Sequence, residues 1–131
     1  MTGPYRILVT GSRNWTDTLA VTAALEQSVI DAGPCPILVV HGACPTGADQ
    51  HADTHARHLR NRGVSIDVER HPANWRPDGR LDRAAGFRRN AEMVAAGADV
   101  CLAFIKGGSR GASHTARLAE QADIPVRRWT S

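Results

Sequence analysis

Residues 100–115 read Val-Cys-Leu-Ala-Phe-Ile-Lys-Gly-Gly-Ser-Arg-Gly-Ala-Ser-His-Thr. The six apolar residues Val100–Ile105 are typical of a strand that is covered on both faces of its sheet. Three glycines within the next six positions permit a tight turn, and helical spacing resumes at Ala112. This order of elements predicts an anion site, because the first turn of a helix has free N–H groups and a partial positive charge.

The turn and the helix start supply several groups that could hold a phosphate. Glycine lets a phosphate approach the backbone, serine and threonine hydroxyls can donate hydrogen bonds, and arginine is a permanent cation. The alternative is that the glycines only form a surface turn, so the hypothesis depends on similar turns meeting at the same place. The candidate ligands here are Gly107, Gly108, Ser109, Arg110, Gly111, Ser113 and Thr115.

The length and composition are typical of one globular domain. The chain has 131 residues, of which 42% are hydrophobic and 22% are charged, so it can form a core without disulfides or metals. No apolar run approaches the ~20 residues that cross a bilayer, and the N-terminus lacks a signal-peptide pattern. We expect a single domain over residues 1–131 that does not bind a membrane.

The cysteines and the charges bear on the cellular compartment and on the kind of ligand to expect. Cys35, Cys44 and Cys101 are odd in number and have no Cys-x-x-Cys spacing, so neither a disulfide scaffold nor a cysteine zinc site is predicted. A reducing cytoplasm is therefore expected. The net charge of +3 is too small to indicate nucleic acid. Fifteen of the sixteen basic residues are arginine, which fits planar recognition of phosphate but is also expected from a GC-rich genome.

Strands and helices alternate along the chain. Branched apolar runs predict strands at residues 5–10, 37–40, 64–68, 100–105 and 125–129. Helical spacing, with caps and stops, predicts helices at about residues 17–32, 48–62, 84–96 and 112–123. The third helix is expected to bury Phe87, Ala91 and Val94. Residues 71–83 show no periodicity, and so long a connection inside a compact domain is usually a functional loop or lid.

The alternation predicts an α/β fold, a three-layer, Rossmann-like, doubly wound parallel sheet of about five strands. The first, second and fourth strands are continuously apolar and therefore central, whereas the third and fifth carry charges and therefore lie at the edges. These assignments give the order 3-2-1-4-5. Ligands of such sheets bind beyond the strand ends where the strand order reverses, here between the first and fourth strands.

Two more glycine-bearing turns would meet at this point. Gly11-Ser12-Arg13 follows the first strand, and Arg13 could either pair with phosphate or be a solvated loop residue. Gly42 and Gly47 belong to the turn after the second strand. Asp49 is either an N-cap or early-turn acid of its helix or a ribose ligand, with capping the safer interpretation, and it could do both if the hydroxyl lies near. The convergence of three glycine turns favours a phosphate-binding cleft.

Other candidates lie outside the glycine turns. Trp15 and Trp75 could each stack on a base or pack its loop onto the domain, and packing is preferred for Trp75. Arg89 and Asn90 lie on the third helix, and Asn90 could bind a ribose or base or contact the long loop. The stripe His51, His55 and His58 is interpreted as a surface or subunit contact, because it lacks a zinc signature, and no metal site is predicted.

Five segments, taken in order, resemble one superfamily. They are Gly11-Ser12-Arg13, His41-Gly42-Ala43 with Gly47-Ala48-Asp49, Pro72-Ala73-Asn74-Trp75, Ala85-Gly86-Phe87-Arg88-Arg89-Asn90 with Met93, and Gly107-Gly108-Ser109-Arg110-Gly111. Together they resemble the SLOG superfamily of SMF/DprA and LOG proteins, and most of all its YspA-type, cpYpsA-related group. The resemblance implies a Rossmann-like domain for nucleotides or their derivatives, in a family of sensors and nucleotide-processing enzymes, many of them homodimers.

Two departures from these relatives bear on activity. LOG-type phosphoribohydrolases have a Gly-Gly-x-Gly-Thr motif followed three residues later by a catalytic glutamate. Here the loop is one residue longer, Ala112 replaces the threonine and Thr115 stands in the place of the glutamate, where it cannot stabilise a sugar cation or activate water. The DNA-processing relatives have Ala-His where this chain has Ala52-Asp53.

We therefore expect a binding module or sensor whose ligand is a nucleoside phosphate or an ADP-ribose-like molecule. No other cofactor is predicted, and self-association as a dimer or tetramer is expected. The alternative is an enzyme, a nucleotide N-glycosidase or related hydrolase of phosphoribohydrolase type, with no catalytic residue identified. A third hypothesis, single-stranded DNA binding, has only the charge of +3 and two loop tryptophans in its favour.

Overall fold

The computed structural model describes residues 3–131, in which five parallel strands form a sheet in the order β3-β2-β1-β4-β5. The strands are β1 (Tyr5–Gly11), β2 (Ile37–His41), β3 (Ile66–Arg70), β4 (Val100–Ile105) and β5 (Val126–Thr130). The helices are α1 (Thr18–Ala32), α2 (Ala48–Asn61), α3 (Ala85–Ala95) and α4 (Arg110–Gln121). The predicted Rossmann-like order is confirmed, and the strand order reverses between β1 and β4.

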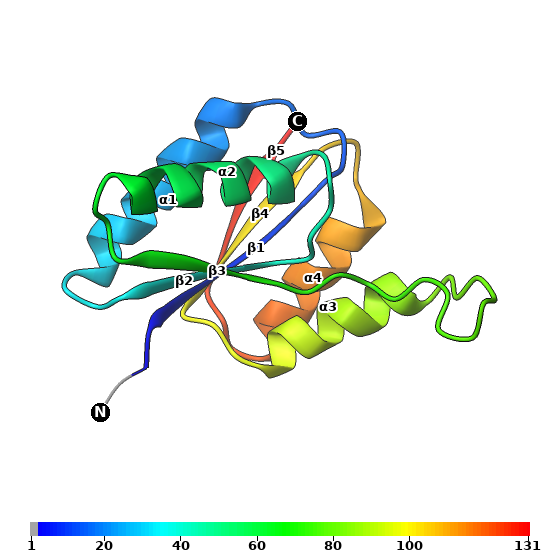
Figure 1. The fold of residues 1–131 in the computed structure, drawn as a ribbon. Coiled ribbons are helices and arrows are strands. Elements are labelled where there is room, and N and C mark those ends of the chain that lie inside the picture. The colour runs from blue at the N-terminus through cyan, green and yellow to red at the C-terminus, as the bar shows by residue number, and fades with distance from the viewer. Residues whose placement is uncertain (1–2) are drawn as a thin grey trace.

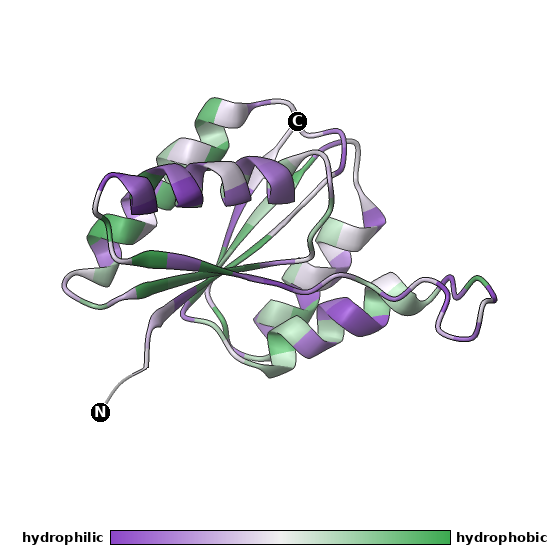
Figure 2. Cartoon of the chain, in the orientation of Figure 1, coloured by the Kyte–Doolittle hydropathy of each residue, from purple (hydrophilic) through white to green (hydrophobic). Residues whose placement is uncertain are grey.

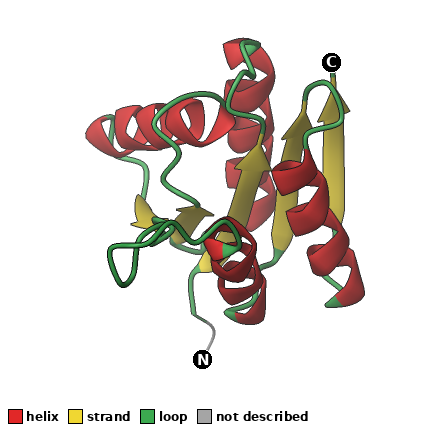
Figure 3. Ribbon diagram, turned by 90° about the vertical axis from the view of Figure 1, so that its right-hand side faces the viewer, coloured by secondary structure: helices red, strands yellow, loops and turns green. Residues whose placement is uncertain are grey.

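The helices cover both faces of the sheet. α1 packs beside α2 on one face, and α3 packs beside α4 on the other (Figure 1). Figure 3 shows neighbouring strand arrows pointing the same way, as a parallel sheet requires. The loops that follow the strands therefore gather at one end of the molecule.

The middle of the sheet is apolar because it is covered on both faces. All six residues of β4 are buried, and Ile7 and Leu8 of β1 are fully enclosed. Figure 2 shows the central strands as hydrophobic, whereas much of α2 is hydrophilic. The strands β3 and β5 carry exposed residues and lie at the edges, as predicted, although β3 begins two residues later than the sequence pattern indicated.

The buried face of α3 differs from the prediction. Phe87 is 42% exposed and Ala91 is also exposed, whereas Asn90, Met93 and Val94 are buried. The Phe87 ring instead lies edge-on against His114 of α4, with 4.7 Å between the ring centroids. Apolar spacing alone could not place this face, because the polar Asn90 occupies a buried position on it.

Residues 71–84 connect β3 to α3 without a strand or helix, as predicted, and extend beyond the end of the sheet (Figure 1). They include Trp75, whose ring lies against Gly86 of α3. Within the described residues, no helix is long and apolar enough to span a bilayer.

Candidate functional site

The loops after β1 and β4 are joined through Ser12. The Lys106 N–H donates to Ser12 Oγ at 2.8 Å, and the Ser12 N–H donates to the Phe104 C=O at 2.9 Å. Ser12 is only 2% exposed, so these bonds lie inside the structure. The prediction that these two loops are neighbours is confirmed.

The turn after β2 packs so closely against the turn after β1 that two positions exclude a side chain. A Cβ at Gly47 would lie 2.2 Å from the Ser12 carbonyl oxygen, and a Cβ at Gly11 would lie 2.2 Å from Ala48 Cβ. The Ala48 N–H also donates to the Ser12 C=O at 3.4 Å. Gly47 has a φ of +77°, which side chains rarely adopt. These glycines bring the three turns together.

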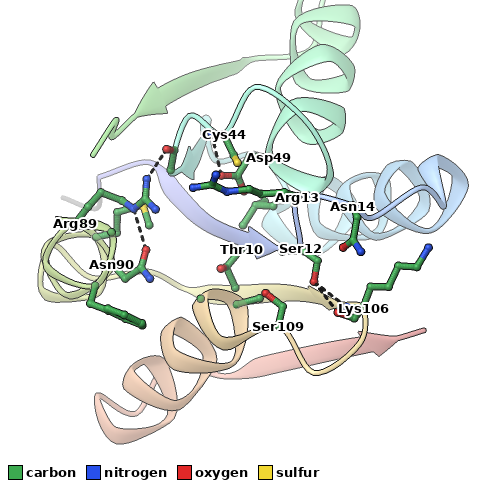
Figure 4. A pocket seen from close by; sticks show the side chains of 18 of the residues that line it. Thr10, Ser12, Arg13, Asn14, Cys44, Asp49, Arg89, Asn90, Lys106 and Ser109 are labelled. Carbon is green, nitrogen blue, oxygen red and sulfur yellow. Dashed lines mark hydrogen bonds between the residues drawn. The ribbon is translucent and has the colours of Figure 1, made fainter. Parts of the chain in front are cut away.

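A cleft of about 470 Å³ opens where the turns meet (Figure 4), a size typical of small-molecule sites. It lies at the point where the strand order reverses, between the ends of β1 and β4. The predicted ligand-binding residues that line it are Gly11, Ser12, Arg13, Gly42, Asp49, Arg89, Asn90, Ser109 and Gly111.

The remaining predicted residues are not part of the cleft wall. Gly107 and Gly108 have positive φ angles and form an exposed turn, as the alternative interpretation of the glycines expected. Thr115 is fully buried, and its hydroxyl donates to the Gly111 C=O within α4. The residues outside the wall are Trp15, Gly47, Gly107, Gly108, Arg110, Ser113 and Thr115.

Trp15 belongs to the hydrophobic core. It is 4% exposed, its ring centroid lies 5.5 Å from that of Phe104, and its Nε1–H donates to the Asp17 C=O at 2.9 Å. Its hydrogen-bonding and stacking capacities are thus used inside the protein. Of the two interpretations of Trp15, packing is the one that the structure supports.

Several residues that line the cleft were not predicted. Asn14 and Lys106 directly adjoin predicted turns, so their positions in the sequence could have identified them as lining residues. Gly86 could have been identified as well, because a glycine inside a helix often marks a close approach of another segment. A Cβ at Gly86 would lie 2.9 Å from the Trp75 ring. The unpredicted lining residues are Val9, Thr10, Asn14, Cys44, Trp75, Arg83, Gly86, Phe87, Met93, Lys106 and Ala112.

Trp75 forms an aromatic wall of the cleft as well as packing its loop. Its ring lies against Gly86 of α3, and it is 37% exposed. The Arg13 guanidinium carbon lies 5.8 Å from the ring centroid, within the range of a cation–π contact. A planar cation and an aromatic ring thus face each other at this wall.

The start of α4 offers hydrogen-bond donors. The Ser113 N–H donates to the Ser109 C=O, so the helical ladder begins there. Within residues 3–131, the N–H groups of Gly111 and Ala112 have no acceptor, and the Ser109 side chain makes no capping bond. All three residues line the cleft. This wall can bind an anion through backbone N–H groups, the helix dipole and a hydroxyl.

Arg89 and Asn90 connect the opposite wall to the turn after β2. The Arg89 guanidinium donates to the Gly42 C=O at 2.6 Å and to the His71 C=O at 3.3 Å, and its Nε–H donates to Asn90 Oδ1 at 2.8 Å. Arg89 therefore holds the wall in place. Because Asn90 Oδ1 is occupied, Asn90 can offer its amide N–H groups to a ligand.

Asp49 is a buried carboxylate that lines the cleft. It lies in the first turn of α2, as the early-turn interpretation predicted, and it makes no capping bond. It is 6% exposed, and its Oδ2 accepts the Cys44 N–H at 3.3 Å. Oδ1 has no hydrogen-bond partner within the described residues. Burial raises the pKa of Asp49 above its ordinary value, although the Cys44 N–H and the charge of Arg89 oppose this.

The histidine stripe lies away from the cleft wall. His51 contacts the Trp15 C=O through Nε2 at 3.2 Å, and the His55 and His58 rings stack with centroids 5.8 Å apart. Across residues 3–131, no group of three or more His, Cys, Asp or Glu side chains is arranged to hold a metal ion.

Comparison with known proteins gives two matches. A model of the YspA, cpYpsA-related SLOG family matches residues 5–77, from β1 through the turn after β2 to the loop that holds Trp75. The Gene 61 protein of Mycobacterium phage D29 is 46% identical over 121 residues, which are 92% of this chain and 93% of the phage protein. The family match covers three of the five segments quoted above, and the phage relative is similar over nearly the whole chain.

Proposed function

The chain belongs to the YspA, cpYpsA-related SLOG family, and we propose that it binds a nucleotide or nucleotide-derived ligand in the cleft, as a sensor or binding module. One observation carries this proposal: a single cleft has anion-binding donors at the start of α4 and an aromatic wall at Trp75. These are the two recognition elements that a phosphate linked to a base requires.

Arg13 is the cation placed to contact the ligand. It is exposed, lines the cleft and lies over Trp75, so it can pair with phosphate or stack with a base. Ser12 holds the loop that carries it. We therefore assign the phosphate to the start of α4, with Arg13 beside it and the base toward Trp75.

Replacing Arg13 with alanine is expected to weaken nucleotide binding about tenfold or more, because a hydrogen bond to a charged group contributes roughly 1.5–3 kcal/mol. The melting temperature of the free protein should not change, since the side chain is exposed. Isothermal titration calorimetry with AMP and ADP-ribose measures the first quantity, and differential scanning calorimetry measures the second.

Arg62→Ala is a matched control, because Arg62 is an exposed arginine just after α2, at the opposite end of that helix from the cleft. It should leave the affinity unchanged. Equal affinities of the wild type and Arg13→Ala would contradict the role assigned to Arg13, and no binding of any nucleotide would contradict the proposed function.

One observation favours the alternative of a hydrolase. Among the described residues that line the cleft, Asp49 is the only carboxylate, and its raised pKa is suited to an acid. Thr115, in the place of the LOG glutamate, is enclosed in α4 and offers no such group. We expect binding without fast turnover. Rapid release of free base from AMP or NAD, measured by chromatography, would favour the hydrolase instead.

We further propose a reducing cytoplasmic setting and self-association. The three cysteines are free, as a reducing compartment would keep them. Leu19 is 79% exposed and Ile30 is 71% exposed, both on α1, and a second copy could cover them. Light scattering after size-exclusion chromatography would detect a monomer if the proposed self-association is wrong.

A further inference from the structure

We propose that the cleft binds a nucleotide with at least two phosphoryl groups, and that Lys106 and Asn14 contact the second of them at the rim. The inference rests on the proposed function, which assigns one phosphate to the start of α4, and it names the class of ligand: nucleoside diphosphates and their esters. Neither Lys106 nor Asn14 takes part in the contacts assigned above to the first phosphate or to the base.

The wall of the cleft is more positive than one phosphate would neutralise. Among the described residues that line it, Asp49 is the only acidic one, whereas the basic ones are Arg13, Arg83, Arg89 and Lys106, so four positive charges and one negative charge leave a net charge of +3. None of these four basic residues forms an ion pair within residues 3–131, although six arginines elsewhere do. A single phosphate ester has a charge of roughly −1.5 to −2 at pH 7, so one phosphate leaves part of this charge unbalanced.

Lys106 is fixed next to the turn that holds Asn14. Its N–H donates to Ser12 Oγ at 2.8 Å, and Asn14 follows Ser12 by two residues. Both Lys106 and Asn14 line the cleft, and Figure 4 shows the Lys106 side chain extending toward Asn14, away from Arg89 and Asn90. Within residues 3–131 neither side chain makes a hydrogen bond or an ion pair. The ammonium group and the amide N–H groups are therefore available to a ligand.

The end of the chain lies beside the Lys106 turn but does not neutralise it. The Ser131 C=O accepts the Gly107 N–H at 3.2 Å, and the Ser109 N–H donates to the Lys106 C=O at 3.3 Å. Among the described residues, no ion pair joins Ser131 to Lys106. The turn is thus held through its backbone, whereas the ammonium group is free to pair with an anion.

The aromatic wall lies at the other end of the cleft from Lys106. The Trp75 ring lies against Gly86, where a Cβ would also be 3.7 Å from the Arg89 guanidinium. In Figure 4, Ser109 at the start of α4 lies between Arg89 and Lys106. The phosphoryl groups of a nucleotide extend away from its base, so a base at Trp75 and a first phosphate at the start of α4 direct the next phosphoryl group toward Lys106. A lysine binds such a group as a point charge.

The experiment compares matched monophosphates and diphosphates by isothermal titration calorimetry. The pairs AMP and ADP, GMP and GDP, CMP and CDP, and UMP and UDP are titrated in buffer with EDTA, so that no divalent cation neutralises the phosphates. We expect the diphosphate of the tightest pair to bind about tenfold more tightly than the monophosphate, because it adds a charge-assisted contact. ADP-ribose distinguishes the two sources of the group: tighter binding than ADP indicates a bridging phosphoryl group, and weaker binding a terminal one.

The variant Lys106→Ala identifies the residue responsible. We expect the diphosphate to lose about tenfold in affinity, the monophosphate to lose little, and the ratio between them to approach one. Arg117→Ala is the matched control, because it removes an equal charge from an exposed position in α4 outside the cleft wall. It should leave the ratio unchanged. Arg13→Ala should weaken both nucleotides alike, since Arg13 is assigned to the first phosphate.

Lys106 is the only lysine in the sequence, so its side chain can be observed directly. Reductive methylation with isotopically labelled formaldehyde labels the ammonium group and keeps its positive charge. In an NMR spectrum, the Lys106 signal should shift when the diphosphate is added and change little with the monophosphate. A signal that ignores the diphosphate would contradict the contact.

Equal affinities of the wild type for the monophosphate and the diphosphate would overturn the inference while leaving the proposed function in place. A preference for the diphosphate that persists in Lys106→Ala would assign the second phosphoryl group to other residues, and an equal loss for both nucleotides would place Lys106 at the first phosphate. Either result overturns the role proposed for Lys106, as does an Arg117→Ala variant that lowers the ratio equally. If no nucleotide binds, the proposed function itself fails.

Discussion

Replacing Asp53 with alanine is expected to lower the free energy of unfolding by about 3 kcal/mol at neutral pH, since breaking a buried ion pair on one side is strongly destabilising. Asp53 is 8% exposed and lies in α2. It accepts hydrogen bonds from Arg57 at 2.8 Å, from Arg70 at 2.7 and 3.0 Å, and from His41 at 2.7 Å. These bonds join α2 to the ends of β2 and β3.

Among the hydrogen-bond partners of Asp53, His41 is the one for which the substitution is most unfavourable. It is 2% exposed, and its Nδ1 accepts the Ala43 N–H, so the proton lies on Nε2 and points to Asp53. Without the carboxylate, this buried N–H has no acceptor. Arg57 and Arg70 are about half exposed and can turn to water instead.

The effect of Asp53 depends on pH with a definite sign. Burial alone would raise the pKa of this carboxyl, but the hydrogen bonds from Arg70, Arg57 and His41 outweigh burial and hold the pKa well below its ordinary value. Its contribution to stability is therefore complete above the unfolded pKa of about 3.9 and is lost as the pH falls below it. The difference between wild type and Asp53→Ala should narrow from pH 5 to pH 3.

Urea denaturation followed by circular dichroism measures these differences, and Asp67→Ala is the control. Asp67 also pairs with an arginine, Arg60, but both side chains are exposed. Its replacement should change the free energy of unfolding little, because exposed ion pairs contribute little. Similar losses in both variants, or a loss at Asp53 that grows on acidification, would contradict the role assigned to this cluster.

Replacing Gly47 with alanine is expected to cost more than about 3 kcal/mol of unfolding free energy, because two penalties add. The φ of +77° combined with a ψ of −148° is a conformation that essentially only glycine adopts, so it costs alanine on the order of 1–3 kcal/mol. The new Cβ would also lie 2.2 Å from the Ser12 carbonyl oxygen and 2.7 Å from the Arg13 carbonyl carbon. These are backbone atoms in the turn after β1, so relief requires the turns to move apart.

Gly79→Ala separates the two penalties. Gly79 has a φ of +76°, nearly that of Gly47, but a Cβ there would meet nothing within 4 Å. It should show the cost of a positive φ without a steric contact, about 1–2 kcal/mol. Equal losses in the two variants, measured by urea denaturation, would mean that the contact between the turns is unimportant. Any Gly47→Ala protein that stays folded should also bind nucleotide more weakly, since Arg13 would be displaced.

The sequence allowed the sheet and the place of the site to be predicted because their signals are local. Val100–Ile105 is apolar at every position, and such a run is stable only between two layers of helices. The charged patterns of β3 and β5 marked the edges, which fixed the strand order. From that order and the glycine turns, the neighbourhood of Ser12 and Lys106 followed.

Individual side chains were predicted less well because their orientation depends on contacts with distant segments. Phe87 was expected to be buried and Trp15 could have faced either way, yet Phe87 borders the cleft and Trp15 lies in the core beside Phe104. Cys44 was assigned no ligand role and packing was preferred to base stacking for Trp75, yet both residues line the cleft. Each case concerns which face of an element is covered by a partner far away in the sequence.

By itself, then, the sequence determined the alternation of strands and helices, the strand order and the three turns that meet, since these follow from apolar runs and glycines a few residues long. Only the tertiary structure decided that Gly47 contacts Ser12, that Asn90 is buried on α3, and that one oxygen of Asp49 is enclosed without a hydrogen-bond partner. The physical reason is that burial and hydrogen bonding are properties of pairs of atoms. Their partners here lie up to tens of residues away along the chain.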